Sequence, residues 1–451
     1  MQTWSDPNNP SNQEAILVWA MKEWAKTRPD VQLELVPVPS RGFMATLNWY
    51  QRQLTAGQAA DVIVWYAHVY ADRADQWFYH FDLSKPNKYG KAASWFQEWP
   101  DPAAQLGTWK SAKGYYALPM TFPSIGNWAI VYNKTVFDKV GVNVPKTWTE
   151  FITVQRKLKE AGYTPFYHPA GGESGINFLG IPVTEYLPNE IAPVRADLER
   201  IQAYRAPSDQ ITAEDWAYAI KKGYRFSGHE GWKEVFRLLK EWSAYWQEGF
   251  LEPPISEDPV ITHRAVMEYI YRDDVEVFAK NPAVDFEWGT FFMPAIDRQA
   301  SRLGRNTTPY RGGGFSPVST TIPFAVPLTT VKKGKLELAL DMLQFVTTAS
   351  MQANAMKHQL VPVPPYAGAP IEKVTSDPVK QTQWRGFFEP SGVGNQPIYV
   401  LPYGLSAQKA TQEYLAGRIS VEDVLRAMDE FAIQWAEDQI RRNPQWNASQ
   451  W

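Results

Sequence analysis

Aromatic and planar polar side chains are the groups in this chain best suited to chemistry. The sequence has 451 residues, of which 20 are Trp and 22 are Tyr, and aromatic residues make up 14% of it. Trp and Tyr faces pack against the apolar C–H faces of sugar rings, while their N–H and O–H groups still reach polar partners. Asp, Glu, Asn, Gln and Arg make paired hydrogen bonds to adjacent hydroxyls. Most of these aromatics must lie in the core or on the surface, but their excess favours a carbohydrate ligand.

Common enzyme signatures are absent from the sequence. It contains no H-E-x-x-H, G-x-x-x-x-G-K-[ST], G-x-S-x-G or G-x-G-x-x-G pattern. Cysteine is absent, which excludes disulfides, thiolate catalysis and Cys-ligated metals. Asp273 and Asp274 are adjacent and do not face each other, so we interpret them as solvated charge. Carboxylate pairs for glycoside hydrolysis depend on distance in space, and the sequence leaves them open. The six His are scattered, with no pair four residues apart: His68, His80, His168, His229, His263 and His358.

Length and charge limit the class of protein. The chain exceeds one ordinary hydrophobic core, which predicts two domains. A net charge of −3 gives no support to nucleic-acid binding. The longest apolar candidate, Ala15 to Ala20, is far shorter than the roughly 20 residues that span a bilayer.

Helix and strand patterns alternate near the amino terminus. A capping box at Ser11 and Glu14 opens a helix, and apolar residues alternate over 31–38 as in a strand. A further helix over 43–56 and a buried strand over 61–66 follow. This β-α-β-α-β order predicts a parallel sheet covered by helices.

In such a sheet, ligands bind beyond the carboxyl ends of the strands. We therefore expect binding residues in the loops after Trp4 and after Val64.

Amphipathic helices are predicted throughout the rest of the chain. Thr147 and Glu150 form a second capping box, whose helix stops at Gly162. Apolar residues at helical spacing predict further helices over 231–248, 405–417 and 420–441.

Three ordered blocks resemble a known family. They read GYYALP over 114–119, YNKTVF over 132–137 and PKTWTEF over 145–151. Further matches are a D-F return strand over 285–294 and a helix over 339–350. By these blocks the chain resembles the bacterial extracellular solute-binding proteins that supply sugars to ABC transporters, a family similar to maltose-binding protein. The resemblance implies an α/β, two-lobed periplasmic-binding-protein-like fold of type II. Each lobe would be a β-sheet flanked by helices, with the ligand cleft between the lobes.

The resemblance also implies where the chain passes between lobes. We expect lobe 1 to comprise 1–121 and 280–345, and lobe 2 to comprise 122–279 and 346–451. The hinge segments would lie near 119–128, 275–294 and 340–350.

Ligand contacts are implied at positions that match the family pattern or lie beside it. Trp4 could instead be a core residue, Asp6 a turn residue and Arg41 a surface charge. The family's usual glycine is missing near 260–280, so we place no contact there. The expected ligand-binding residues are Trp4, Asp6, Arg41, Trp65, Tyr66, His68, Asn127, Trp128, Glu173, Trp288, Arg311, Gly313, Gly314 and Trp384.

The function implied by the resemblance is reversible capture of a sugar. We expect a monomer that binds an oligosaccharide by hinge closure and delivers it to an ABC permease, with no catalytic residue, cofactor, metal or nucleic acid. No signal peptide is recognisable at the amino terminus. We expect an extracytoplasmic protein, either periplasmic or a cell-surface lipoprotein, whose signal is absent from this sequence; a cytoplasmic protein is the alternative.

Two other classes of function stay open. One is a carbohydrate-active enzyme with a Trp-rich cleft, which would need two carboxylates facing each other. The other is a binding protein for a polyamine, phosphate ester or peptide. A polyamine site would be ringed by carboxylates, whereas a phosphate site would present helix N-termini or Arg.

Overall fold

The structure is a computed structural model in which the described residues form two compact units. Unit 1 holds the described parts of 1–124 and 317–367, and unit 2 holds those of 125–203, 209–316 and 368–451. The described residues are 2–3, 12–37, 43–64, 73–99, 102, 106, 109–111, 113–120, 128–170, 213–253, 255, 257–271, 274–304, 322–355, 371–373, 375–388 and 405–451.

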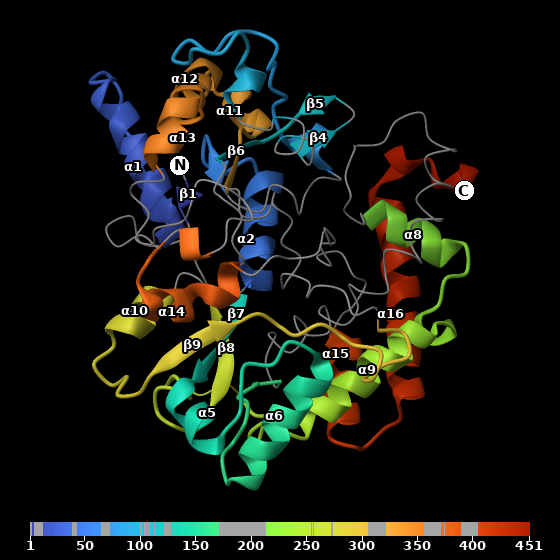
Figure 1. Ribbon diagram of the computed structural model, residues 1–451. Helices are drawn as coiled ribbons and strands as arrows, with labels where there is room; N and C mark the ends of the chain where they lie inside the picture. Colours follow the sequence, from blue (N-terminus) through green and yellow to red (C-terminus); the bar gives the residue numbers. More distant parts are fainter. Residues whose placement is uncertain are drawn as a thin grey trace. The chain divides into compact units, whose positions relative to one another are not determined.

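Unit 1 combines short strands with helices (Figure 1). Strand β1 pairs with β2 in parallel, β10 lies between β3 and β6, and β4 pairs with β5. The strands are β1 (Gln2–Thr3), β2 (Val36–Pro37), β3 (Ile63–Val64), β4 (Lys110–Ser111), β5 (Gly114–Tyr115), β6 (Leu118–Met120) and β10 (Ile322–Ala325). The helices are α1 (Asn12–Lys26), α2 (Phe43–Thr55), α3 (Ala74–Trp77), α11 (Leu328–Lys332), α12 (Leu336–Val346) and α13 (Ala349–Ala355), with a short 3-10 helix at Trp95–Glu98.

The predicted order of elements at the amino terminus is present, with shorter strands. The expected parallel pairing joins only β1 and β2, because β3 pairs antiparallel with β10 in another sheet. Helix α2 confirms the helix expected over 43–56. Of the strand expected over 31–38, only β2 pairs with another strand. Val31, Leu33 and Leu35 pack against the core, which explains their alternating pattern without a hydrogen-bonded ladder. Ser11, the expected helix cap, lies outside the described residues.

A buried carboxylate ties α12 to α1 in the core of unit 1. Asp341 accepts hydrogen bonds from Trp24 Nε1 at 3.0 Å, Arg28 at 2.6 Å and Tyr89 at 2.8 Å, and it also contacts Lys88. Burial alone would raise the pKa of Asp341, but these donors outweigh it and lower the pKa to about 2. The carboxyl group is therefore ionised and fully partnered.

Unit 2 is built around the antiparallel sheet β8-β7-β9 (Figure 1). Its strands are β7 (Trp128–Asn133), β8 (Met267–Tyr271) and β9 (Trp288–Phe291). Its helices are α5 (Lys134–Val140), α6 (Trp148–Glu160), α8 (Ala213–Lys221), α9 (Glu230–Ser243), α10 (Val275–Lys280), α14 (Pro378–Phe388), α15 (Leu405–Leu415) and α16 (Val421–Arg442). Short 3-10 helices lie at Phe226–Gly228, Ile371–Lys373, Pro444–Trp446 and Ala448–Gln450.

Helix boundaries in unit 2 follow the predicted caps. Thr147 and Glu150 form the expected capping box of α6, and Gly162 has φ 84°, a left-handed conformation that suits a glycine after a helix. Helix α9 ends at Ser243, five residues before the predicted end at 248. Trp246 lies beyond that end but is still buried, because its ring packs on Trp242.

Trp242 is the centre of the aromatic core of unit 2. Its ring centroid lies 5.9 Å from that of Trp148, 5.7 Å from Phe151 and 5.0 Å from Phe166. Its Nε1 donates to Gln155 Oε1 at 3.1 Å. Much of the aromatic excess in the sequence is therefore used in packing.

The boundaries between the units differ from the expected lobes. Residues 280–304 lie in unit 2, because β9 pairs with β7. Helix α13 lies in unit 1 with α1 and α12. The expected hinges near 275–294 and 340–350 thus fall inside units. The chain passes between units after 120 and before 128, after 304 and before 322, and after 355 and before 371.

In the part of the chain that the structure describes, no helix has both the length and the apolar character needed to cross a membrane.

Candidate ligand-binding site

Several predicted contacts lie near one edge of the β3-β10-β6 sheet in sequence. Strands β3 and β6 both run antiparallel to β10, with Val64 opposite Phe324 and Met120 opposite Ile322. The carboxyl ends of β3 and β6 therefore lie at the same edge as the amino end of β10. The predicted residues that follow β3 or precede β10 lie outside the described residues: Trp65, Tyr66, His68, Arg311, Gly313 and Gly314.

The carboxyl ends of β1 and β2 also lie side by side, because these two strands pair in parallel. Gln2 lies opposite Val36 and Thr3 opposite Pro37, so both strands end at one edge. Trp4 and Asp6 follow β1 and Arg41 follows β2, all three outside the described residues. The order of the strands thus places the starts of these loops together, as the rule for ligands at carboxyl ends requires.

Unit 2 has an edge of the same kind. Phe166 forms parallel bridges with Trp246 and with Met267, so the segments 165–170 and 245–250 run in the direction of β8. Tyr271, at the carboxyl end of β8, lies opposite Trp128 at the amino end of β7. We call this edge, formed by the ends of 165–170, 245–250 and β8 and the start of β7, the unit 2 site edge.

Three predicted residues lie on the unit 2 site edge or within three residues of it in sequence. The backbone of Trp128 is on it, Asn127 precedes Trp128, and Glu173 comes three residues after Ala170. Asn127 and Glu173 lie outside the described residues.

Two predicted tryptophans have different positions. Trp288 lies opposite Asn133, at the end of the sheet away from Trp128, and it is 6% exposed with its ring 4.8 Å from Phe278. This position argues against the predicted ligand contact, since packing against α10 accounts for the residue. Trp384 on α14 is also buried, with its ring 5.6 Å from Phe387, so its role in binding stays a prediction.

Two residues that no sequence pattern indicated bind the backbone at the unit 2 site edge. They are Gln247, which bonds to His168, and Gln412, which bonds to Ala170. Gln412 is 242 residues from Ala170 in sequence. No local pattern could have revealed this pairing, because it depends on how α15 packs in unit 2.

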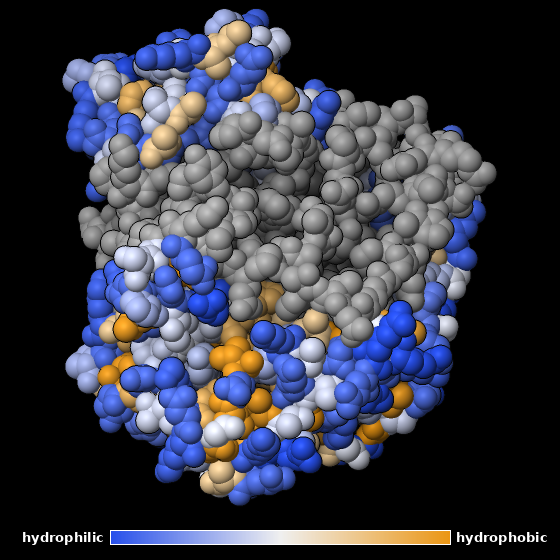
Figure 2. Space-filling view, viewed as in Figure 1, coloured by the Kyte–Doolittle hydropathy of each residue, from blue (hydrophilic) through white to orange (hydrophobic). Residues whose placement is uncertain are grey.

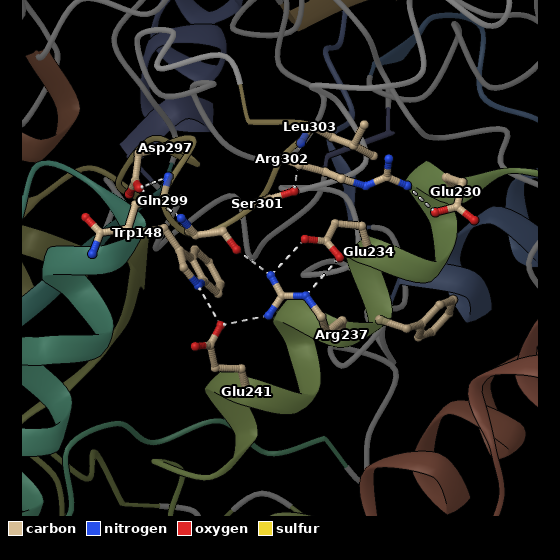
Figure 3. A network of polar contacts seen from close by, with 12 residues as sticks. Trp148, Glu230, Glu234, Arg237, Glu241, Asp297, Gln299, Ser301, Arg302 and Leu303 are labelled. Atoms are coloured by element: carbon tan, nitrogen blue, oxygen red, sulfur yellow. Dashed lines mark hydrogen bonds and ion pairs between the residues drawn. The ribbon is translucent and has the colours of Figure 1, made fainter.

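Carboxylates on α9 are paired with a cation, which bears on the alternative of a glycoside hydrolase. Arg237 makes two hydrogen bonds of 2.8 Å to Glu234 and lies 3.6 Å from Glu241 (Figure 3). Arg237 holds the pKa of Glu234 below its usual range. Such a carboxylate is a poor general acid, which needs a raised pKa. The network instead ties α9 to Ala300, whose carbonyl accepts from Arg237, and to Trp148, which donates to Glu241 at 3.3 Å.

Glu268 and Asp258 form a second group of carboxyls, in which the pKa of Glu268 is raised, whereas that of Glu234 is lowered. Burial, and then the neighbouring Asp258 carboxyl, raise the pKa of Glu268 well above its usual range. Asp258 Oδ1 accepts from the backbone N–H groups of Val260 and Ile261 at 3.0 and 2.8 Å. Glycosidase carboxyl groups stand roughly 5 to 9.5 Å apart, with the sugar between them. The Asp258 carboxylate is instead held within its own turn by these two N–H groups.

A Ser, His and Asp group in unit 1 lacks the geometry of a catalytic triad. His80 Nε2 lies 2.8 Å from Asp75 Oδ1 and 2.9 Å from Ser111 Oγ. A catalytic His uses one ring nitrogen for each partner, whereas here one nitrogen contacts both. The group connects α3 to the β4–β5 hairpin. Among the described residues, no cluster of three or more His, Asp or Glu side chains is placed to hold a metal ion.

Comparisons with known proteins agree with this topology. A sequence profile of bacterial extracellular solute-binding proteins matches residues 8–194. The multiple sugar-binding protein of Streptococcus mutans is 26% identical over 348 residues, which is 76% of this chain and 70% of its own length. A solved chitin oligosaccharide binding protein has a TM-score of 0.61 at 16% identity, covering 97% of this chain and 98% of its own. A sugar transporter from Bacillus licheniformis in complex with stachyose has a TM-score of 0.57 at 13% identity, covering 96% and 99%.

These likenesses show the fold: the chain has the α/β fold of the two-lobed solute-binding proteins. The resemblance to the bacterial extracellular solute-binding proteins, inferred from the blocks near 114–151, is also confirmed.

Proposed function

We propose that this protein is an extracytoplasmic receptor that binds an oligosaccharide and delivers it to an ABC permease. The observation that carries the proposal is topological. Several predicted aromatic contacts, namely Trp4, Trp65 and Trp128, lie at or next to strand ends that meet at a shared edge of a sheet. The similar proteins are named for binding multiple sugars or chitin oligosaccharides, or were solved with stachyose bound. These names support a carbohydrate as the ligand class.

The proposed mechanism consists of reversible binding, and no covalent bond to the sugar is made or broken. A sugar contacted by residues of both units favours a closed conformation, because the closed state makes contacts that the open state lacks. The permease then recognises the closed, loaded receptor. The protein acts as a monomer, since one chain supplies both units.

Aromatic residues explain the choice of an oligosaccharide. Trp65 and Tyr66 follow β3, Trp4 follows β1 and Trp128 begins β7. Each could supply one stacking surface for a sugar ring, and several such surfaces suit a ligand of several rings. Planar polar residues nearby in sequence, such as Asp6 and Arg41, supply hydrogen bonds to hydroxyls.

A thermal-shift titration with product analysis tests the proposal. The protein is heated with stachyose, a chitin tetrasaccharide, maltose and glucose, and each sugar is then recovered and analysed. A ligand that binds only the folded state at 100 times its Kd adds about 2.7 kcal/mol of stability. We expect a raised melting temperature with an oligosaccharide that is recovered intact.

The other outcomes each exclude part of the proposal. Cleaved sugar would identify a hydrolase. No shift with any sugar, but a shift with spermidine, a phosphate ester or a peptide, would replace the carbohydrate by that class of solute.

A further inference from the structure

The segment 165–170 reaches the unit 2 site edge with strand-like partners along its first half. Phe166 donates its backbone N–H to Tyr245 at 3.3 Å, and its carbonyl accepts from Gln247 at 3.1 Å. Tyr167 donates to the carbonyl of Met267, at the start of β8, at 2.9 Å. Up to Tyr167, the segment is therefore held by backbone groups of its neighbours on both sides.

Side-chain amides hold the second half of the segment. Gln247 Oε1 accepts from the backbone N–H of His168 at 2.7 Å, and Gln247 Nε2 donates to the carbonyl of His168 at 3.2 Å. The N–H of Ala170 bonds to the carbonyl of Phe250 at 2.7 Å. The carbonyl of Ala170 accepts from Gln412 Nε2 of α15 at 2.9 Å. Two glutamines thus take the place of strand partners for His168 and for the carbonyl of Ala170.

Packing fixes the same residues from the core side. His168 is 1% exposed, and its ring lies 4.3 Å from Trp246 and 5.9 Å from Trp242. Burial lowers the pKa of His168 to about 3, so the ring is neutral at physiological pH. Ala170 is 4% exposed. Because Ala170 is buried, its carbonyl needs a partner from the protein, and Gln412 provides one.

We propose that Gln412, together with Gln247, is a positioning residue for carbohydrate binding. It holds the backbone of Ala170 at the unit 2 site edge and so fixes the point from which the chain continues toward Glu173. The inference rests on the proposed function, and it adds a residue on α15 that lies outside the three family blocks over 114–151. Gln412 acts through the backbone of Ala170.

The chemistry of the amide allows a paired test. Only the N–H donor of Gln412 is used on Ala170, so Gln412→Glu keeps the size of the side chain and removes the donor. Gln412→Lys keeps a donor on a side chain of similar length. Losing the bond leaves a buried carbonyl without a partner, which predicts about fivefold weaker binding of a neutral sugar in the Glu variant. The Lys variant should bind within about twofold of the wild type.

The experiment measures the Kd for stachyose by calorimetry, together with the melting temperature and amide hydrogen exchange of peptides covering 166–176. Lys409→Ala, at an exposed position of the same helix, is the control. We expect Gln412→Glu to weaken binding and to speed exchange in these peptides in the absence of sugar, while exchange in α16 is unchanged. A purely structural role would instead lower the melting temperature and speed exchange in both α15 and α16, leaving the Kd of the folded protein unchanged.

The outcomes separate this inference from the proposed function. If the wild type binds stachyose and Gln412→Glu binds it equally well, the positioning role is wrong and the proposed function stands. If the wild type binds neither stachyose nor the other sugars, the proposed function fails and the positioning role fails with it.

Discussion

Thr290 of β9 inserts its hydroxyl between backbone groups of α14, accepting from the N–H of Gly386 at 3.0 Å and donating to the carbonyl of Gln383 at 2.9 Å. Helix and strand are in unusually close contact here. A Cβ built on Gly386 would lie 2.7 to 2.8 Å from backbone atoms of Phe291. This glycine is required by packing, and it anchors the first long helix after the chain returns to unit 2.

Gly386→Ala should therefore destabilise the protein, although alanine is normally the better helix former. The added methyl group must push α14 away from β9 and weaken both bonds to Thr290. We expect a loss of about 2 kcal/mol in the free energy of unfolding, measured by urea denaturation. Gly228→Ala is the matched control, because its Cβ would meet nothing within 4 Å, and it should change stability by less than about 0.5 kcal/mol. Equal effects of the two substitutions would contradict the packing argument.

Asp341→Asn should lower stability near neutral pH and matter less in acid. The pKa of Asp341 falls from 3.8 to about 2 on folding, so the ionised group contributes stability above pH 3.8 that is lost as the pH falls toward 2. At pH 7 we expect a loss of about 2 kcal/mol, because the shift is nearly two pKa units. Urea midpoints of both proteins between pH 3 and pH 7 measure the effect. The difference in the free energy of unfolding between wild type and Asp341→Asn should become smaller as the pH falls.

Asp30 provides the control for Asp341, since it pairs with the same Arg28 but is exposed. Asp30→Asn should have a smaller effect at neutral pH, because solvent screens an exposed ion pair. A gap between wild type and Asp341→Asn that stays constant across the pH range would mean that ionisation of Asp341 contributes nothing.

Local sequence patterns predicted much of the fold, because the interactions concerned are local. The capping box of Thr147 and Glu150 spans one helical turn, and α6 begins where it indicates. The buried face of α9, from Trp232 to Trp242, follows from helical spacing alone. The same apolar spacing predicts that Trp246 belongs to this helix, although α9 ends at Ser243.

Features set by pairing over long distances could not be predicted in the same way. Gln412 and Ala170 meet only because α15 packs in unit 2, and Trp288 lies opposite Asn133 because of the register between β7 and β9. Register decides at which end of a strand a residue lies, and hydrophobic alternation carries no information about it.

Glu268→Gln should remove a pH dependence of stability with the sign opposite to that of Asp341. The pKa of Glu268 is raised on folding, so its contribution is fully present below the ordinary pKa of a glutamate and is lost as the pH rises toward the raised value. The amide of Gln can donate to Asp258 at every pH without ionising. We expect Glu268→Gln to be more stable than the wild type at pH 8. Its stability should also change less with pH over this range. Thermal melts of both proteins from pH 5 to pH 8 measure it, and parallel curves would show that Glu268 ionises normally in the folded state.

Two tryptophan substitutions test which sheet edges bind the sugar. Trp288→Phe should destabilise unit 2 by about 1 to 2 kcal/mol through lost packing on Phe278, and it should leave the Kd for stachyose within about twofold of the wild type. Trp65 follows β3 at the edge shared with β6 and β10, and Trp65→Ala should weaken binding about tenfold through the lost stacking surface. Calorimetric titration of each folded variant gives the Kd, and urea denaturation gives the stability. If Trp288→Phe weakened binding more than Trp65→Ala, the ligand would contact the end of β9 beside Asn133, and the site edges inferred from the strand order would be wrong.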